Sequence, residues 1–152
     1  MKIEEEIKST NPIDISKKVM LNIHFTRNTI SDKFSEILRP YAISVEQFNV
    51  LRILRGQKDK TVNMNLIQER MMTKNSNTTR LIDKLLTKEM VTRRICPENR
   101  RKMEITITKK GLQSLDELDK KVKEHDNYFT QNLNNEELNQ LNDLLEKIRT
   151  IK

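Results

Sequence analysis

Basic residues gather in one short stretch of the chain, RRICPENRRKMEITITKKG, which spans residues 93–111. Arg93, Arg94, Arg100, Arg101 and Lys102 fall within ten positions around a single proline. Cations at this density can pair with phosphate groups, and arginine enters narrow, electronegative DNA minor grooves. The stretch predicts a polyanion-binding hairpin, although a charged hairpin tip is also often only a solvated turn.

A second polar cluster precedes an apolar stripe at helical spacing. Hydroxyls, an amide and a guanidinium at a helix start can reach base edges or phosphates, and Lys84 one turn later suits a phosphate. The same residue types also serve simply as helix caps. Together the two clusters give the DNA-contact candidates Ser76, Asn77, Thr78, Thr79, Arg80, Lys84, Arg94, Arg100, Arg101 and Lys102.

The positive charge is regional. Residues 52–110 hold 16 Lys and Arg against 6 Asp and Glu, whereas the rest of the chain holds 13 against 16. A net charge of +10 in the middle, carried by slightly acidic flanks, is typical of a segment that binds a polyanion.

The elements that must position these clusters follow from hydrophobic periodicity. Helical spacing covers residues 13–38, and Ser44 with Gln47 forms a capping box for a helix that ends at Gly56. A short helix capped by Asn63 precedes a helix from about Asn75 to Lys88. The period then changes to two over residues 91–96 and 103–108, which predicts two strands. Helices capped by Thr108 and by Asn134 with Glu137 complete the chain.

Two short helices, a tight turn and a strand hairpin make a winged helix-turn-helix, whose second helix fits a major groove. The predicted fold class is therefore mainly α with a small β-hairpin wing (α+β), flanked by N- and C-terminal helices. Two motifs then resemble the MarR family of regulators: NTTRLIDKLLTKEMVTRR is similar to its recognition helix and first wing strand, and ENRRKMEITITKKG is similar to its wing. The resemblance extends from Ile13 to Ile148.

The resemblance implies a single MarR-like domain over residues 1–152, with a DNA-binding lobe at 44–108 and a helical dimerisation region at 11–40 and 109–150. Arg101 takes the place of the family's minor-groove arginine, and Thr108 and Gly111 hold the ends of its L-T-x-x-G signature. Family members are two-fold dimers, although apolar stripes alone also fit an intramolecular bundle.

Two residues depart from the family pattern. Asn99 stands where the family usually has aspartate, so an ion pair that braces the wing arginine is reduced to a hydrogen bond. Glu89 stands where glycine usually ends the recognition helix, so the corner must close without the residue best suited to left-handed geometry.

Family members also commonly bind small aromatic or phenolic compounds between the dimer helices and the DNA-binding lobe. The residues selected for such a pocket, by their position on the expected helices, are His24, Phe48, Arg52 and Leu115. Cys96 raises the possibility of redox sensing, but the reactive cysteine of that branch of the family lies in the first helix, which has none here. An incidental thiol is the favoured interpretation of Cys96.

Other function classes lack their residues. The chain has two histidines, one cysteine and no phosphate-loop or nucleophile motif, so we expect no enzyme, no cofactor and no metal. Its longest apolar run is far short of a membrane span, and the acidic N-terminus is unlike a secretory signal. Together with the family resemblance, which implies the dimer and the ligand response, the sequence predicts a cytoplasmic homodimer that binds a pseudo-palindromic operator on double-stranded DNA as a ligand-responsive repressor. The alternative is a winged-helix module that binds RNA or a partner protein.

Overall fold

The computed structural model describes residues 2–58, 60–73, 76–97, 99 and 103–150. The helices are α1 (Ile3–Glu6), α2 (Ile15–Leu38), the 3-10 helix η1 (Arg39–Tyr41), α3 (Val45–Arg55), α4 (Met64–Arg70), α5 (Thr78–Thr87), α6 (Lys109–Thr130) and α7 (Asn135–Arg149). The strands are β1 (Val62–Asn63), β2 (Val91–Ile95) and β3 (Met103–Ile107). The predicted mainly α winged helix-turn-helix, with helices at both ends, is confirmed.

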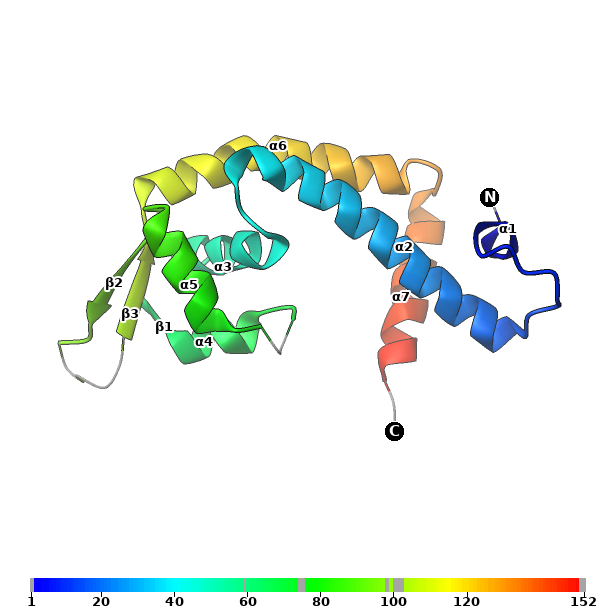
Figure 1. Ribbon diagram of the computed structural model, residues 1–152, viewed down its shortest axis with the longest axis horizontal. Helices are drawn as coiled ribbons and strands as arrows, with labels where there is room; N and C mark the ends of the chain where they lie inside the picture. The colour runs from blue at the N-terminus through cyan, green and yellow to red at the C-terminus, as the bar shows by residue number, and fades with distance from the viewer. Residues whose placement is uncertain (1, 59, 74–75, 98, 100–102, 151–152) are drawn as a thin grey trace.

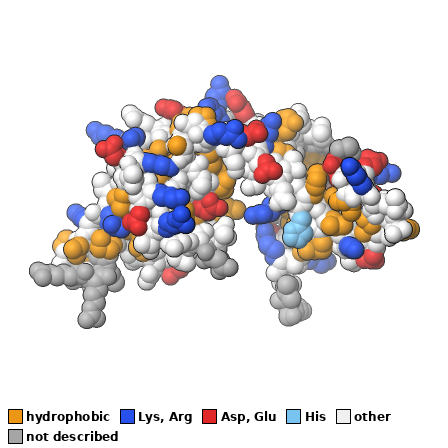
Figure 2. Space-filling view, in the orientation of Figure 1, with side chains coloured by type: hydrophobic (Ala, Val, Ile, Leu, Met, Phe, Trp, Pro, Cys, Tyr) orange, Lys and Arg blue, Asp and Glu red, His pale blue; other side chains and the backbone are white. Residues whose placement is uncertain are grey.

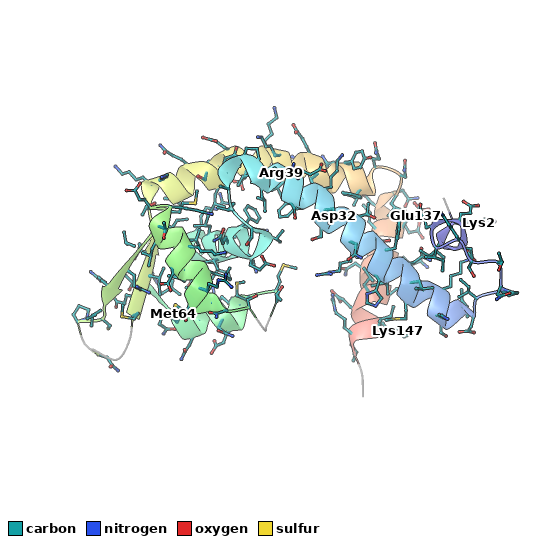
Figure 3. The ribbon with its side chains drawn as sticks, viewed as in Figure 1. Lys2, Asp32, Arg39, Met64, Glu137 and Lys147 are labelled. Atoms are coloured by element: carbon teal, nitrogen blue, oxygen red, sulfur yellow. The ribbon has the colours of Figure 1, made fainter. Side chains whose placement is uncertain are left out.

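The molecule has two parts, which Figure 1 shows side by side. Helices α3, α4 and α5 and the small sheet form a winged-helix lobe, which comprises residues 44–108. Helices α2 and α6 pack against each other and extend away from this lobe, and α1 and α7 lie at their far end. Arg39, labelled in Figure 3, marks the point where α2 passes into η1 above the lobe.

The helix starts predicted from capping residues are confirmed. Ser44 and Gln47 form a reciprocal capping box at the start of α3, and Asn63 accepts from the backbone N–H of Leu66 at 2.9 Å. At the start of α6, Thr108 Oγ1 accepts from the Gly111 N–H at 3.1 Å. A cap is a contact between residues two or three positions apart, so it can be read from sequence alone.

The sheet has three antiparallel strands in the order β1-β3-β2, and the prediction of two strands was incomplete. The additional strand, β1, consists of two residues, with Val62 opposite Ile105. Two residues are too few to show a hydrophobic period, so β1 is recognised only from its pairing with β3. The predicted alternation also fails along β2, where Val91 is buried but Ile95 is 58% exposed. The reason is that the outer part of the hairpin projects away from the helices that the structure describes (Figure 1).

One hydrophobic core lies inside the winged-helix lobe and reaches the first half of α6. Fully buried side chains from five elements meet there: Leu38, Leu51, Ile82, Ile105 and Leu115. Leu38 at the end of α2 and Leu115 in α6 therefore anchor the two long helices on the lobe. Their outer halves contribute little to this core.

A surface ion pair adds a second connection between the lobe and α6. Arg55 Nη1 and Nη2 lie 2.8 and 2.9 Å from the two carboxylate oxygens of Asp119, and Asp116 lies 3.4 Å from Nη1. The bidentate hydrogen bonds from Arg55 lower the pKa of the Asp119 carboxyl below its ordinary value of 3.8. Bidentate geometry is the favourable case for a partly exposed pair.

Asp119→Asn is expected to lower the free energy of unfolding by about 0.5–1 kcal/mol at pH 7. Because the folded-state pKa of Asp119 is lowered, its contribution is present above the ordinary value of 3.8 and is lost as the pH falls through the lowered value. Urea unfolding of wild type and variant from pH 7 to pH 3 measures this difference. Asp116→Asn is the matched control and should have little effect, and equal losses from both variants would contradict the bidentate pairing.

Candidate nucleic-acid interface

Helices α4 and α5 form the helix-turn-helix, and Thr78 fixes their junction. Thr78 is 4% exposed, and its Oγ1 donates to Gln68 Oε1 at 3.0 Å. The first residue of α5 thus packs against α4. The Thr78 hydroxyl is directed into the turn in this arrangement, and a contact between Thr78 and DNA stays a prediction.

Ser76 and Asn77 also serve the turn. Asn77 Oδ1 accepts from the backbone N–H of Arg80 at 3.0 Å, so Asn77 caps α5, which begins at Thr78 and not near residue 75. Ser76 Oγ is buried and has no hydrogen-bond partner among the described residues. Of the polar residues at this helix start, Thr78 and Asn77 therefore make local hydrogen bonds within the turn, and the Ser76 hydroxyl is buried there.

The remaining three candidates on α5 face outward. Thr79, Arg80 and Lys84 are exposed, and neither cation forms an ion pair with another described residue. Arg80 and Lys84 border an open groove of about 460 Å³ between the start of α3 and α5. Its lining residues are Ser44, Glu46, Thr73, Ser76, Asn77, Arg80, Leu81 and Lys84. Ser44 and Glu46 were missed by sequence reasoning, because only folding brings the start of α3 beside α5.

Two arginines of β2 are paired within the lobe. Arg93 Nη1 lies 2.7 Å from Asp83 Oδ1 on α5, and Arg94 Nε lies 2.7 Å from Glu104 Oε2 on β3. The hydrogen bond from Arg94 lowers the pKa of the Glu104 carboxyl. The Arg94 side chain is still 65% exposed, so it stays accessible to a phosphate. Arg93 instead ties the wing to α5.

The outer ends of the wing strands and the start of α5 point to the same side of the molecule, as Figure 1 shows. Arg100, Arg101 and Lys102, which the sequence places at the hairpin tip, lie outside the described residues. Figure 2 shows Lys and Arg side chains distributed over the surface of the winged-helix lobe, with acidic side chains among them. A protruding helix beside a projecting hairpin can enter a major groove and the adjacent minor groove.

Comparison with known proteins agrees with this geometry. Residues 43–103, which span α3 to the start of β3, match the model of the MarR family. This chain carries a MarR-family domain. No match is found among curated proteins.

Solved structures share the fold over nearly the whole chain. A MarR-like transcription regulator from Bacillus cereus is 25% identical, with a TM-score of 0.78 over 88% of this chain and 95% of that chain. A MarR transcription factor from Planctomyces limnophilus is 29% identical, with a TM-score of 0.69 over 90% and 98%. A mutant MarR from E. coli, solved with operator DNA, is 23% identical, with a TM-score of 0.76 over 90% and 99%.

The corner after α5, within the part of the chain that matches the MarR family, closes on Glu89, which has the left-handed φ of 58°. Its carbonyl accepts from Thr108 Oγ1 at 2.8 Å, and its carboxylate lies 3.4 Å from Lys110 Nζ at the surface. A residue with a Cβ is disfavoured in this conformation by about 1–2 kcal/mol, whereas glycine is not. The unusual glutamate therefore carries backbone strain.

Glu89→Gly is expected to raise the free energy of unfolding by about 0.5–1 kcal/mol, because relief of strain exceeds the added entropy of the unfolded chain. Glu89→Ala is the control, since it removes the carboxylate but keeps the Cβ. Thermal and urea unfolding of both variants measure the effect. An alanine variant as stable as the glycine variant would assign the change to the carboxylate instead.

The four residues selected for a ligand pocket line neither of the two grooves described here, and their role in ligand binding stays a prediction. Phe48 and Leu115 are buried in the core, and His24 is exposed on α2. Arg52 lies over the Phe48 ring, 5.9 Å from its centroid. A groove of about 380 Å³ instead lies between α2 and α6, lined by Lys33, Ile37, Lys121, Glu124, His125 and Tyr128. Selection by element alone could not tell which face of each helix packs inward.

Two further expectations concern absences. Among the described residues, no group of three or more His, Cys, Asp and Glu side chains is placed to hold a metal ion. Within the same ranges, no helix combines the length and apolar character that a membrane crossing needs. Cys96 is half-buried at the end of β2, where its carbonyl accepts from the Asn99 N–H at 3.2 Å.

Proposed function

We propose that this protein is a sequence-specific DNA-binding transcriptional regulator, and that it acts as a homodimeric repressor on a pseudo-palindromic operator. In this proposal α5 enters the major groove, and the hairpin carrying Arg101 enters the flanking minor groove. The proposal includes a cytoplasmic location, no enzymatic activity and no cofactor.

The outward face of α5 is the observation that carries the proposal. Thr79, Arg80 and Lys84 are exposed beside a groove, within a region of net charge +10. The cations can contact phosphates or guanine, and the threonine offers a hydroxyl and a methyl group for base edges. The E. coli relative solved with operator DNA supports this use of the fold.

Unburied apolar side chains support the homodimer. Of 13 exposed large hydrophobic residues in the described part of the chain, 11 lie outside the winged-helix lobe, chiefly on α2 and α7. Helix α7, whose start and end are marked by Glu137 and Lys147 in Figure 3, has no buried residue. Figure 2 shows hydrophobic side chains gathered at this helical end. An amphipathic helix left uncovered by its own chain requires a partner surface, and we assign that surface to a second copy.

Ligand response is proposed as a population shift between dimer geometries. A small aromatic ligand would favour a separation of the two recognition helices that no longer matches one turn of DNA, so operator affinity would fall. The groove between α2 and α6, with Lys33, Lys121 and Tyr128 in its lining, offers cations and an aromatic ring for such a ligand. A dimer that bound operator equally well with and without an effective ligand would contradict this mechanism.

Fluorescence anisotropy tests the main proposal directly. The protein is added, in separate titrations, to three labelled nucleic acids: the DNA upstream of its own gene, a scrambled duplex and a single-stranded RNA. Each titration is repeated at several salt concentrations. We expect a preference for the upstream duplex of about 10³-fold or more, with a steep decrease of affinity with salt. Equal, weak binding to all three would mean that the charge attracts polyanions without specificity. A salt slope near zero would favour a protein partner.

Arg101→Ala is expected to weaken operator binding by about 1–3 kcal/mol and to reduce the salt slope by about one unit. The reason is the loss of one cation from the minor groove, as the family resemblance implies. Anisotropy titration against the same duplex at several salt concentrations measures both quantities. Lys123→Ala, on the exposed face of α6, removes an equal charge away from the wing and should leave both unchanged.

A further inference from the structure

The end of the recognition helix is connected to the corner between α2 and α3 by one side chain. Lys88 follows α5, and its Nζ donates to the carbonyl of Ala42 and to Gln47 Oε1, the latter at 3.2 Å. Ala42 is the C-cap of η1, which follows α2, and it has the left-handed conformation. Lys88 therefore joins two parts of the chain that are more than 40 residues apart.

The acceptor on α3, Gln47 Oε1, is held in place by contacts that do not involve Lys88. Gln47 is 3% exposed, and its Oε1 also accepts from the backbone N–H of Ser44 at 3.0 Å. Ser44 Oγ in turn accepts from the Gln47 N–H, which completes the capping box. Because these hydrogen bonds hold Gln47 Oε1 in one place, they also define where the Lys88 ammonium group lies.

The ammonium group of Lys88 is drawn partly out of water. Partial burial, followed by the charge of Lys84, lowers the pKa of the Lys88 amine. Withdrawing a cation from solvent is unfavourable unless its donors are satisfied. Two acceptors among the described residues, a carbonyl and an amide oxygen, take two of the three N–H donors without neutralising the charge.

The residues after Lys88 are held by α6. The carbonyls of Glu89 and Met90 accept from Oγ1 and the backbone N–H of Thr108, at 2.8 and 3.0 Å. Figure 1 shows the end of α5 and the starts of β2 and α6 meeting at this corner. Residues 88–90 are thus linked to the corner between η1 and α3, which follows α2, and to the N-cap of α6. Helices α2 and α6 lead from there to the proposed dimer surface.

We propose that Lys88 is a positioning residue, which fixes the direction of α5 relative to α2 and α6 and thereby sets the half-site separation that the dimer accepts. The inference rests on the proposed operator binding. A ten-residue helix is about 15 Å long, so a tilt of about 20° at the Lys88 end moves the DNA-facing end by roughly 5 Å. That displacement exceeds the rise of one base pair, about 3.4 Å.

The test compares duplexes that differ only in half-site separation. Wild-type protein first selects its preferred duplex from a random pool, and base pairs are then inserted or removed, one or two at a time, between the half-sites. Dissociation constants are measured by anisotropy at fixed salt for wild type, Lys88→Met and Lys88→Arg. Lys88→Met keeps much of the side-chain length without donors, whereas Lys88→Arg restores them.

We expect Lys88→Met to reduce the preference for the native separation over altered separations by about tenfold, and Lys88→Arg to recover most of it. Lys84→Met is the matched control from the exposed face of the same helix. It should weaken binding to every duplex equally, reduce the salt slope by about one unit and leave the separation profile unchanged.

Three results would overturn the inference. An unchanged separation profile for Lys88→Met would show that α5 keeps its direction without the hydrogen bonds from Lys88 to Ala42 and Gln47. Uniform weakening with a smaller salt slope would show that Lys88 contacts phosphate as Lys84 is expected to do. Failure of the wild type to select any duplex would remove the proposed function itself and the inference with it. If Lys88→Met is not fully folded at 25 °C, Lys88→Leu, which also lacks donors, takes its place with the same expected profile.

Discussion

Replacing Gly111 by alanine is expected to lower the free energy of unfolding by about 3 kcal/mol. A Cβ at this position would lie 2.4 Å from the carbonyl oxygen of Met90 and 2.8 Å from Cγ1 of Ile107. The first of these atoms belongs to the backbone, so it cannot move aside as the end of a flexible side chain can. The start of α6 must shift away from the corner, and the Thr108 hydrogen bonds that hold this corner must lengthen.

Urea unfolding followed by circular dichroism measures this change. Gln113→Ala, at an exposed position two residues later in α6, is the control for the helix-forming tendency of alanine and should change stability by less than about 0.5 kcal/mol. If Gly111→Ala is as stable as wild type, α6 can move away from the Met90 carbonyl without loss of folding free energy. The close approach would then not be a requirement of the fold.

The double variant Leu141→Glu and Leu145→Glu is expected to be monomeric and to lose operator affinity by at least about 100-fold. Both leucines are exposed on α7, within the stripe that also carries Leu138 and Ile148. Two carboxylates in an apolar interface would be desolvated without partners, so association becomes unfavourable. A monomer binds one half-site only and loses the gain from binding both half-sites as one unit.

Sedimentation analysis and anisotropy on the same samples measure both effects. The control variant, Gln140→Glu with Lys147→Gln, makes an equal change of net charge on α7 away from the stripe and should remain dimeric. A monomeric wild type, or a Leu141→Glu and Leu145→Glu variant that still dimerises, would contradict the assignment of α7 to the interface. Retained helicity of the double variant distinguishes lost association from lost folding.

The sequence by itself was sufficient for the features that depend on near neighbours. Capping by Ser44 with Gln47, by Thr108 and by Asn134 with Glu137 involves residues a few positions apart, so it was predicted correctly. The change of period at residue 91 likewise revealed the wing. The concentration of positive charge in residues 52–110 needed only counting.

The tertiary structure decided which of the candidate residues are available. Thr78 was predicted to contact DNA, but its hydroxyl is taken by Gln68 across the turn. Phe48 was predicted to line a pocket, but it packs in the core beside Phe34. The direction of a side chain depends on partners that are distant in sequence, and a local pattern contains no information about them.

The same reason explains what sequence reasoning missed. The pairing of Val62 with Ile105, the ion pair of Arg93 with Asp83 and the link from Lys88 to the α2–α3 corner all join separate segments. The sequence near each of these residues gives no sign of its distant partner. Local sequence therefore determined the elements and their charge, and long-range packing decided which side chains of α5 and its neighbours are buried or paired and which are exposed for the proposed contact with DNA.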